Sequence, residues 1–168
     1  MGNFKHLTDL EIQQMTFDWR YKGWTVLELL TETEVDEINE ELDRLRLERN
    51  ASEPEKWQEH EPFMYPHKLS SKLEKLFTHP KMIEAMEFLM EGDVIGLQTW
   101  AYFKPKGELG RDQHQNAFYT GCGHNEIINT ALALDNHDPE NGAVWNYEGS
   151  HRLPTLPIED LSLIHISE

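Results

Sequence analysis

Residues 97–119 read LQTWAYFKPKGELGRDQHQNAFY and residues 133–152 read ALDNHDPENGAVWNYEGSHR, and these two stretches decide the fold class. The segment 94–103, which leads into the first stretch, is rich in β-branched and aromatic residues, and Gly and Pro interrupt both stretches. This is typical of short strands joined by turns. The Asn141-Gly142 pair is a strong hairpin signal. We therefore expect a loop and turns at 104–110, 120–123 and 138–142, and strands at 94–103, 114–119, 126–134 and 143–147.

The first half of the chain predicts helices. Thr8-x-x-Glu11 and Thr31-x-x-Glu34 are capping boxes, which mark helix starts. Gly23 follows the first helical pattern, where a glycine commonly ends a helix. The second pattern carries a single apolar stripe, which predicts one buried face. Its members are Val35, Ile38, Leu42 and Leu45. The stripe spans little more than one heptad, which favours core packing over a coiled coil.

The remaining segments of the first half are shorter. We expect a strand at 24–29 and a loop at 50–66, where three prolines occur. A short helix is expected at 70–77. Pro80 suits the first position of another helix, which Gly92 would end.

Helices followed by strands predict an α+β domain. The sequence offers about five strands, whereas a closed jelly roll needs roughly eight. We therefore expect N-terminal helices packed on an incomplete double-stranded β-helix, that is, a jelly-roll or cupin-like sheet. A chain of 168 residues fits one domain, which we place at 1–160.

The net charge and the cysteine content argue against several classes of function. The net charge of −16 disfavours binding to nucleic acid or to anionic membranes. Cys122 is the single cysteine, which excludes an intrachain disulfide and a zinc site built from cysteines. No secretory signal or membrane-spanning run is apparent, and with a single cysteine this leads us to expect a cytoplasmic protein. The sequence does not indicate an oligomeric state.

Residues 161–168 form an unusual tail. Their sequence, LSLIHISE, is the in-frame translation of CTGTCTCTTATACACATCTCCGAG, a transposon end used in sequencing-library adapters. We interpret the tail as adapter-derived; a genuine amphipathic tail is the alternative.

The side chains of the His114-Gln-Asn116 motif are the ones most suited to take part in chemistry. Residues i and i+2 of a strand point to the same face, so His114 and Asn116 would project together. Non-haem iron oxygenases bind the metal through two histidines and one carboxylate. Alone, the His-x-Asn pattern is a weak signal. Asp112, two residues before His114, is an alternative source of the missing carboxylate.

The order of the motifs resembles the phytanoyl-CoA dioxygenase family over about residues 7–153. The shared features are a strand ending in Lys-Pro, a glycine-containing loop, a His-Gln motif, an Asn-Gly turn and a Gly-Ser-His-Arg stretch. The resemblance implies a non-haem Fe(II)/2-oxoglutarate-dependent dioxygenase that hydroxylates a small organic or acyl substrate, with Fe(II) as cofactor and 2-oxoglutarate as co-substrate.

The resemblance also assigns residues. His114 corresponds to the first iron ligand, and Asn116 stands where the family has a carboxylate ligand. Lys104 corresponds to a lysine that contacts 2-oxoglutarate, and Gln98 is expected to line the same pocket. His151 lies in a structural turn and is not the second iron-binding histidine. That histidine and the arginine that anchors 2-oxoglutarate are expected beyond Arg152, so we expect the chain to be a C-terminally truncated, inactive part of an oxygenase.

Asn116 leaves two alternatives open. A degraded site in the same fold would make a non-catalytic protein that binds a small ligand. Loss of the carboxylate also opens a position for halide, as in halogenases, but Asn116 is larger than the small residues that this chemistry prefers.

Overall fold

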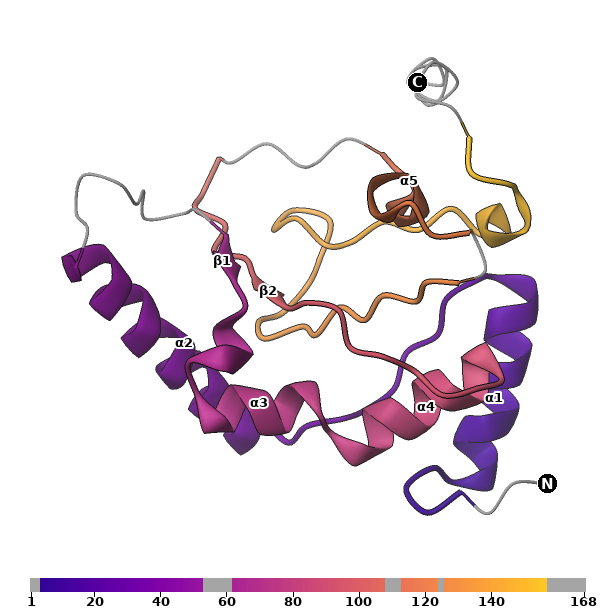
Figure 1. The fold of residues 1–168 in the computed structure, drawn as a ribbon, viewed down its shortest axis with the longest axis horizontal. Coiled ribbons are helices and arrows are strands. Elements are labelled where there is room, and N and C mark those ends of the chain that lie inside the picture. The colour runs from indigo at the N-terminus through magenta and orange to yellow at the C-terminus, as the bar shows by residue number, and fades with distance from the viewer. Residues whose placement is uncertain (1–3, 53–61, 108–112, 124–125, 157–168) are drawn as a thin grey trace.

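The computed structural model describes residues 4–52, 62–107, 113–123 and 126–156. The chain is an α+β protein in which helices outnumber strands (Figure 1). The elements are α1 (Asp9–Tyr21), α2 (Glu32–Ser52), β1 (Phe63–Met64), the 3₁₀ turn η1 (Pro66–Lys68), α3 (Ser71–Phe77), α4 (Pro80–Met90), β2 (Trp100–Ala101), α5 (Asn116–Thr120) and the 3₁₀ turn η2 (Ser150–Arg152).

Both predicted capping boxes are confirmed. Before α1, the Thr8 hydroxyl accepts the Glu11 N–H and the Glu11 carboxylate accepts the Thr8 N–H, at 3.3 and 2.9 Å. Thr31 and Glu34 repeat this exchange at the start of α2, at 3.3 and 2.8 Å. Gly23 ends α1 as predicted: its φ is +86° and its N–H donates to the Asp18 carbonyl.

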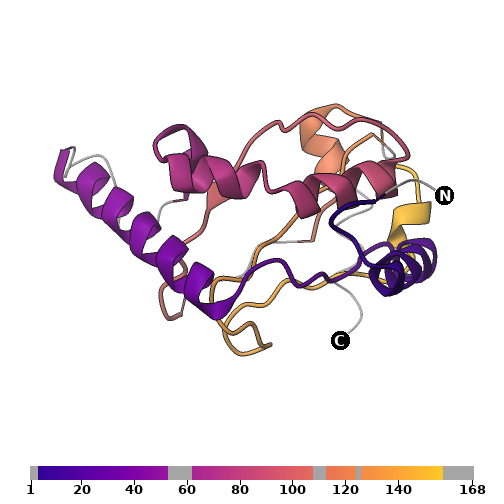
Figure 2. The same cartoon turned by 90° about the horizontal axis from the view of Figure 1, so that it is seen from below.

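The helices form an arc from α2 through α3 and α4 to α1, with β1, β2 and the 126–149 chain on its inner side (Figure 1). Figure 2 shows the same arc from below. Two apolar clusters lie along it. One joins α2 to α3 and β1, and the other joins α1 to α4 and the N-terminal segment. Their buried members are Ile38, Leu42, Leu45, Phe63 and Leu73 in the first, and Leu7, Met15 and Ala85 in the second. The predicted stripe of α2 is therefore confirmed, with Val35 half-buried at its edge.

The short helices are also confirmed, with small shifts. Ser70 is the N-cap of α3, and Pro80 occupies the first turn of α4. The left-handed residue after α4 is Glu91, with φ +55°, rather than Gly92. In the predicted loop at 50–66, α2 continues to Ser52 and β1 occupies 63–64, while 53–61 lie outside the described residues.

The predicted strands are mostly wrong. The described residues contain one antiparallel pair, β1 with β2, in the register Phe63↔Ala101 and Met64↔Trp100. Only 100–101 of the predicted strand 94–103 are paired. Segments 24–29, 126–134 and 143–147 have strand composition, but they are not assigned to a sheet. A strand needs a neighbouring strand to satisfy its backbone groups, and composition does not supply that partner.

The short sheet has two unlike faces. Phe63, Ala101 and Phe103 face the cluster formed by α2 and α3. On the other side, Met64 and Trp100 stand opposite each other and are 43% and 38% exposed. Tyr102 stacks on Trp100, with ring centroids 6.0 Å apart. One face thus holds the core, and the other leaves aromatic rings open to solvent.

None of the helices in the described ranges is both long enough and apolar enough to cross a bilayer.

Candidate functional site

The His114-Gln-Asn116 motif lies where extended chain turns into the short helix α5. The predicted strand at 114–119 is wrong here, because Asn116 begins a helix. Gln115, the N-cap, is extended, with φ −104° and ψ 125°. An extended residue points its side chain away from those of its two neighbours, so His114 and Asn116 still leave the backbone on a common side. Both are exposed.

Local hydrogen bonds explain why α5 replaces a strand. The Thr120 hydroxyl donates to the carbonyls of Asn116 and Ala117, at 3.4 and 3.3 Å. Gly121 closes the helix with φ +68°, and its N–H donates to the Ala117 carbonyl at 3.1 Å. A glycine adopts this left-handed conformation readily, so it ends the turn that the preceding residues begin.

Two further contacts define the surroundings of the motif. The His114 ring meets the Tyr119 ring edge-on, with centroids 5.5 Å apart. On the opposite side of the backbone, the Gln115 amide binds the main chain of a distant segment. Its Nε2 donates to the Pro154 carbonyl at 3.2 Å, and its Oε1 accepts the Leu156 N–H at 2.7 Å. The sequence analysis gave Gln115 no role, and its alternation with His114 and Asn116 was the only available signal.

The two residues expected to contact 2-oxoglutarate lie elsewhere in the described chain. Lys104 is exposed, and its Nζ donates to the Gly142 carbonyl at 3.4 Å, which brings it to the turn at 138–142. Gln98 is exposed on the segment that leads to β2. Among the described residues, no hydrogen bond joins either of them to His114 or Asn116.

His151 belongs to a structural joint. The turn η2 lies against the end of α1 in both views (Figures 1 and 2). The Gly149 N–H donates to the Lys22 carbonyl at 2.9 Å, and the Arg152 guanidinium donates to the Arg20 carbonyl at 2.5 Å. The His151 ring packs directly on Gly23. These contacts hold the Gly-Ser-His-Arg stretch on α1.

The residues of the motif fit part of an iron site. An imidazole nitrogen is a common ligand of Fe(II), and an amide carbonyl oxygen is a neutral, weaker one. Within the described ranges, no three residues among His, Cys, Asp and Glu are grouped to hold a metal ion. His114 and Asn116 therefore supply two donors and need a third from elsewhere. Asp112, the alternative carboxylate, lies outside the described residues.

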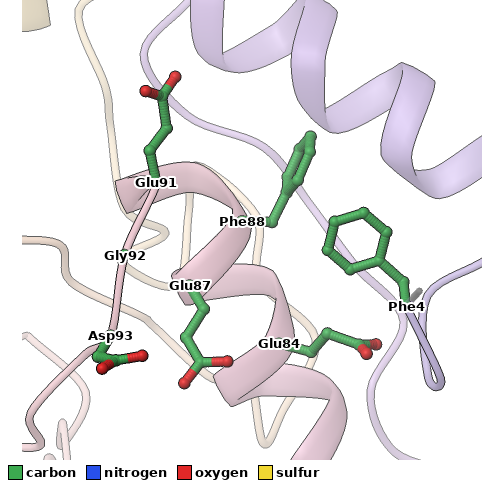
Figure 3. Close-up of a pocket in the computed structure, with 7 residues that line it drawn as sticks. All are labelled: Phe4, Glu84, Glu87, Phe88, Glu91, Gly92 and Asp93. Atoms are coloured by element: carbon green, nitrogen blue, oxygen red, sulfur yellow. The ribbon is translucent and has the colours of Figure 1, made fainter. Parts of the chain in front are cut away.

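A hollow of about 450 Å³ lies away from this motif, between the N-terminal segment and α4 (Figure 3). Figure 3 shows the Phe4 and Phe88 rings on its rim and several acidic side chains along α4. The Glu84 carboxylate accepts the backbone N–H groups of Lys5, His6 and Leu7 at 2.6–2.9 Å. Desolvation raises the pKa of Glu84, but these three donors outweigh it and the pKa lies below its usual range. Glu84 thus anchors the N-terminal segment.

Comparison with known proteins identifies the family of this chain. No curated protein and no solved structure matches the sequence significantly. The family model described as Phytanoyl-CoA dioxygenase (PhyH) matches residues 19–159. That range covers most of the chain and includes the His114-Gln-Asn116 motif, β2 and η2. The chain belongs to the phytanoyl-CoA dioxygenase family.

Proposed function

We propose that this chain is part of a non-haem Fe(II)/2-oxoglutarate-dependent dioxygenase that hydroxylates a small organic or acyl substrate. The observation that carries the proposal is the family match over residues 19–159, within which His114 and Asn116 are both exposed. Fe(II) and 2-oxoglutarate would together activate O₂, the oxidant of a substrate C–H bond. The protein would supply ligands, orientation and a pocket.

Each site residue has a proposed role. His114 would bind the metal through an imidazole nitrogen, and Asn116 would add a neutral oxygen in place of a carboxylate. The Lys104 ammonium would meet a carboxylate of 2-oxoglutarate. In the structure, the Lys104 ammonium donates to the Gly142 carbonyl over a long distance of 3.4 Å. Because this carbonyl is neutral, a charged carboxylate would be a stronger acceptor and would replace it favourably. Gln98 would line the same pocket.

We also propose that the fold is a jelly roll whose sheets extend beyond the β1–β2 pair. The open aromatic face of that pair supports this, because Trp100 and Tyr102 alternate with the packed residues Ala101 and Phe103. An uninterrupted apolar run such as 100–103 is typical of a strand that is covered on both faces of its sheet. In a jelly roll, the open face would line the interior.

The alternative function is a non-catalytic protein of the same fold that binds a small ligand. Asn116 favours it, because an amide leaves the metal site without its anionic ligand. The two functions differ in one measurement, the Fe(II)-dependent conversion of 2-oxoglutarate to succinate and CO₂. We would make it on the full-length gene product that contains this chain, loaded with Fe(II). Succinate formation that depends on His114 supports the dioxygenase, and the absence of succinate formation supports the binding protein.

The substitution Asn116→Asp tests the site directly. A carboxylate binds Fe(II) more tightly than an amide does, since it adds a negative charge to the site. We expect the affinity for Co(II), a stable substitute for Fe(II), to rise by on the order of tenfold in isothermal titration. Asn129→Asp, which adds the same charge at another exposed position, is the matched control and should leave the affinity unchanged. An equal gain in both variants would contradict a role for Asn116 as a ligand.

A further inference from the structure

We propose that Gln115 is a positioning residue that fixes the orientation of His114 and Asn116 by binding the chain that follows η2. The inference rests on the proposed function, because it assumes that His114 and Asn116 hold the metal. Gln115 itself would touch neither the metal nor the substrate. Its side chain points toward residues 154–156.

The Gln115 side-chain amide makes two hydrogen bonds, one as a donor and one as an acceptor. The amide donates to the Pro154 carbonyl at 3.2 Å and accepts the Leu156 N–H at 2.7 Å, so it binds this backbone as a neighbouring strand would. Gln115 is half-buried, and both partners lie about 40 residues further along the chain. Two bonds from one planar amide fix its rotation as well as its position.

The direction of the Gln115 side chain determines where its neighbours point. Gln115 is the extended N-cap of α5, and side chains alternate along extended backbone. Holding Gln115 toward residues 154–156 therefore holds His114 and Asn116 on the other side. If this backbone twisted so that Gln115 turned to the other side of the chain, the side chains of His114 and Asn116 would change sides with it. That twist would break the hydrogen bonds of Gln115 to Pro154 and Leu156, so these two bonds oppose it.

The segment that Gln115 binds is itself held in place. Residues 154–156 follow η2, which is tied to the end of α1 by the Gly149–Lys22 and Arg152–Arg20 hydrogen bonds. A continuous path of contacts thus runs from α1 through η2 to Gln115. Through this path, the helical part of the protein sets the orientation of a motif that otherwise lies on exposed chain.

The metal-free protein offers a direct measurement of His114 orientation. Because the Tyr119 ring lies 5.5 Å from the His114 ring, its ring current should shift the His114 Hε1 resonance. Tyr119→Leu would identify that contribution. We expect Gln115→Ala to remove most of the shift, with Gln115→Glu intermediate, because a carboxylate still accepts the Leu156 N–H but no longer donates to Pro154. Gln13→Ala, at an exposed position on α1, is the matched control and should leave the shift unchanged.

Metal affinity is the second measurement. We expect Gln115→Ala to weaken Co(II) binding by on the order of tenfold relative to the control, and Gln115→Glu to weaken it less. If Gln115→Ala does not fold, the comparison of Gln115→Glu with the control still measures the effect. The proposal is overturned if amide exchange changes only at 154–156, while the His114 resonance and the Co(II) affinity stay as in the unchanged protein. Gln115 would then only hold the later segment.

Failure of the proposed function would look different. In that case Co(II) would bind independently of His114 and Asn116, or not at all, in the unchanged protein. The His114 resonance would still report whether Gln115 orients this residue in the absence of metal. A shift that Gln115→Ala removes would keep the positioning role, and a shift that it leaves intact would overturn it.

Discussion

At the residue scale, the His151 ring of η2 packs closely against Gly23 at the end of α1. A Cβ built on Gly23 would lie 2.2 Å from Nδ1 of His151, far inside van der Waals contact. Gly23 also has φ +86°, a conformation that other residues adopt only at a cost. Two independent constraints therefore require glycine at this position, one from the helix end and one from the packing of η2.

Alanine substitutions at three glycines would measure the two constraints separately. Gly92 has an ordinary φ and open space, Gly121 has φ +68° and open space, and Gly23 has both the positive φ and the close contact. We expect Gly92→Ala to change the free energy of unfolding by less than about 0.5 kcal/mol and Gly121→Ala to cost about 1 kcal/mol. Gly23→Ala should cost more than about 2 kcal/mol. Urea unfolding followed by circular dichroism would measure all three; equal costs at Gly23 and Gly121 would contradict the His151 contact.

Residue-level signals in the sequence succeed where the partner is near. Thr8 with Glu11 and Thr31 with Glu34 act across three residues, so each capping box can be recognised without a fold. Gln115 is the opposite case. Its partners lie about 40 residues away, and nothing in its own neighbourhood indicates them. The His-x-Asn motif can therefore be recognised from the sequence alone, whereas the partners of Gln115 cannot.

At the scale of elements, one lysine joins three segments. Lys81 on α4 donates to the Glu11 carboxylate of α1 at 2.5 Å and to the Glu28 carbonyl at 2.9 Å. The hydrogen bond from Lys81, with the backbone and hydroxyl bonds from Thr8, lowers the pKa of Glu11 to about 2. The N-terminal end of α1 thus depends on a charge that α4 supplies.

Acid should weaken this joint. Because the pKa of Glu11 is lower in the folded chain than its ordinary value of 4.5, the contribution is fully present above pH 4.5 and is lost as pH falls toward about 2. We expect Glu11→Gln to be less stable than the unchanged protein at pH 7 and to lose less stability between pH 4.5 and 2. Urea midpoints across this range would measure both effects. Glu87→Gln, at an exposed position on α4, is the control, and the same flattening there would contradict the assignment to Glu11.

Whether a helix or strand was predicted correctly depended on how far along the chain the residues that stabilise it lie. Helices α1 to α4 were predicted because caps, prolines and apolar stripes are local signals. Strands were overpredicted because β-rich composition at 126–134 and 143–147 does not provide a pairing partner. At 116–120, the Thr120 hydroxyl bonds and the left-handed Gly121 make a short helix where the sequence analysis had predicted a strand.

At the scale of the whole molecule, exposed apolar side chains and the net charge have opposite effects on self-association. Large apolar side chains remain open on the segments around β2 and on 143–147: Ile95 and Trp145 are 84% and 76% exposed, and Trp100 and Tyr102 form a stacked pair at the surface. Exposed apolar surface of this kind favours association. The net charge of −16 opposes it, because two copies repel each other before their apolar surfaces meet.

Salt should therefore promote self-association of this chain. Electrostatic repulsion acts over about 30 Å at 0.01 M salt and about 10 Å at 0.1 M, so added NaCl removes the barrier while leaving the apolar attraction. We expect light scattering at fixed protein concentration to show a rising mass between 0.01 and 0.5 M NaCl. Replacing Trp100 and Tyr102 with Thr should reduce the rise, whereas Leu10→Thr, at a 75% exposed position on α1, should leave it in place. A mass that falls with salt would mean that charge pairs drive the association, and an equal effect of Leu10→Thr would mean that the open face of the β1–β2 sheet has no special part in it.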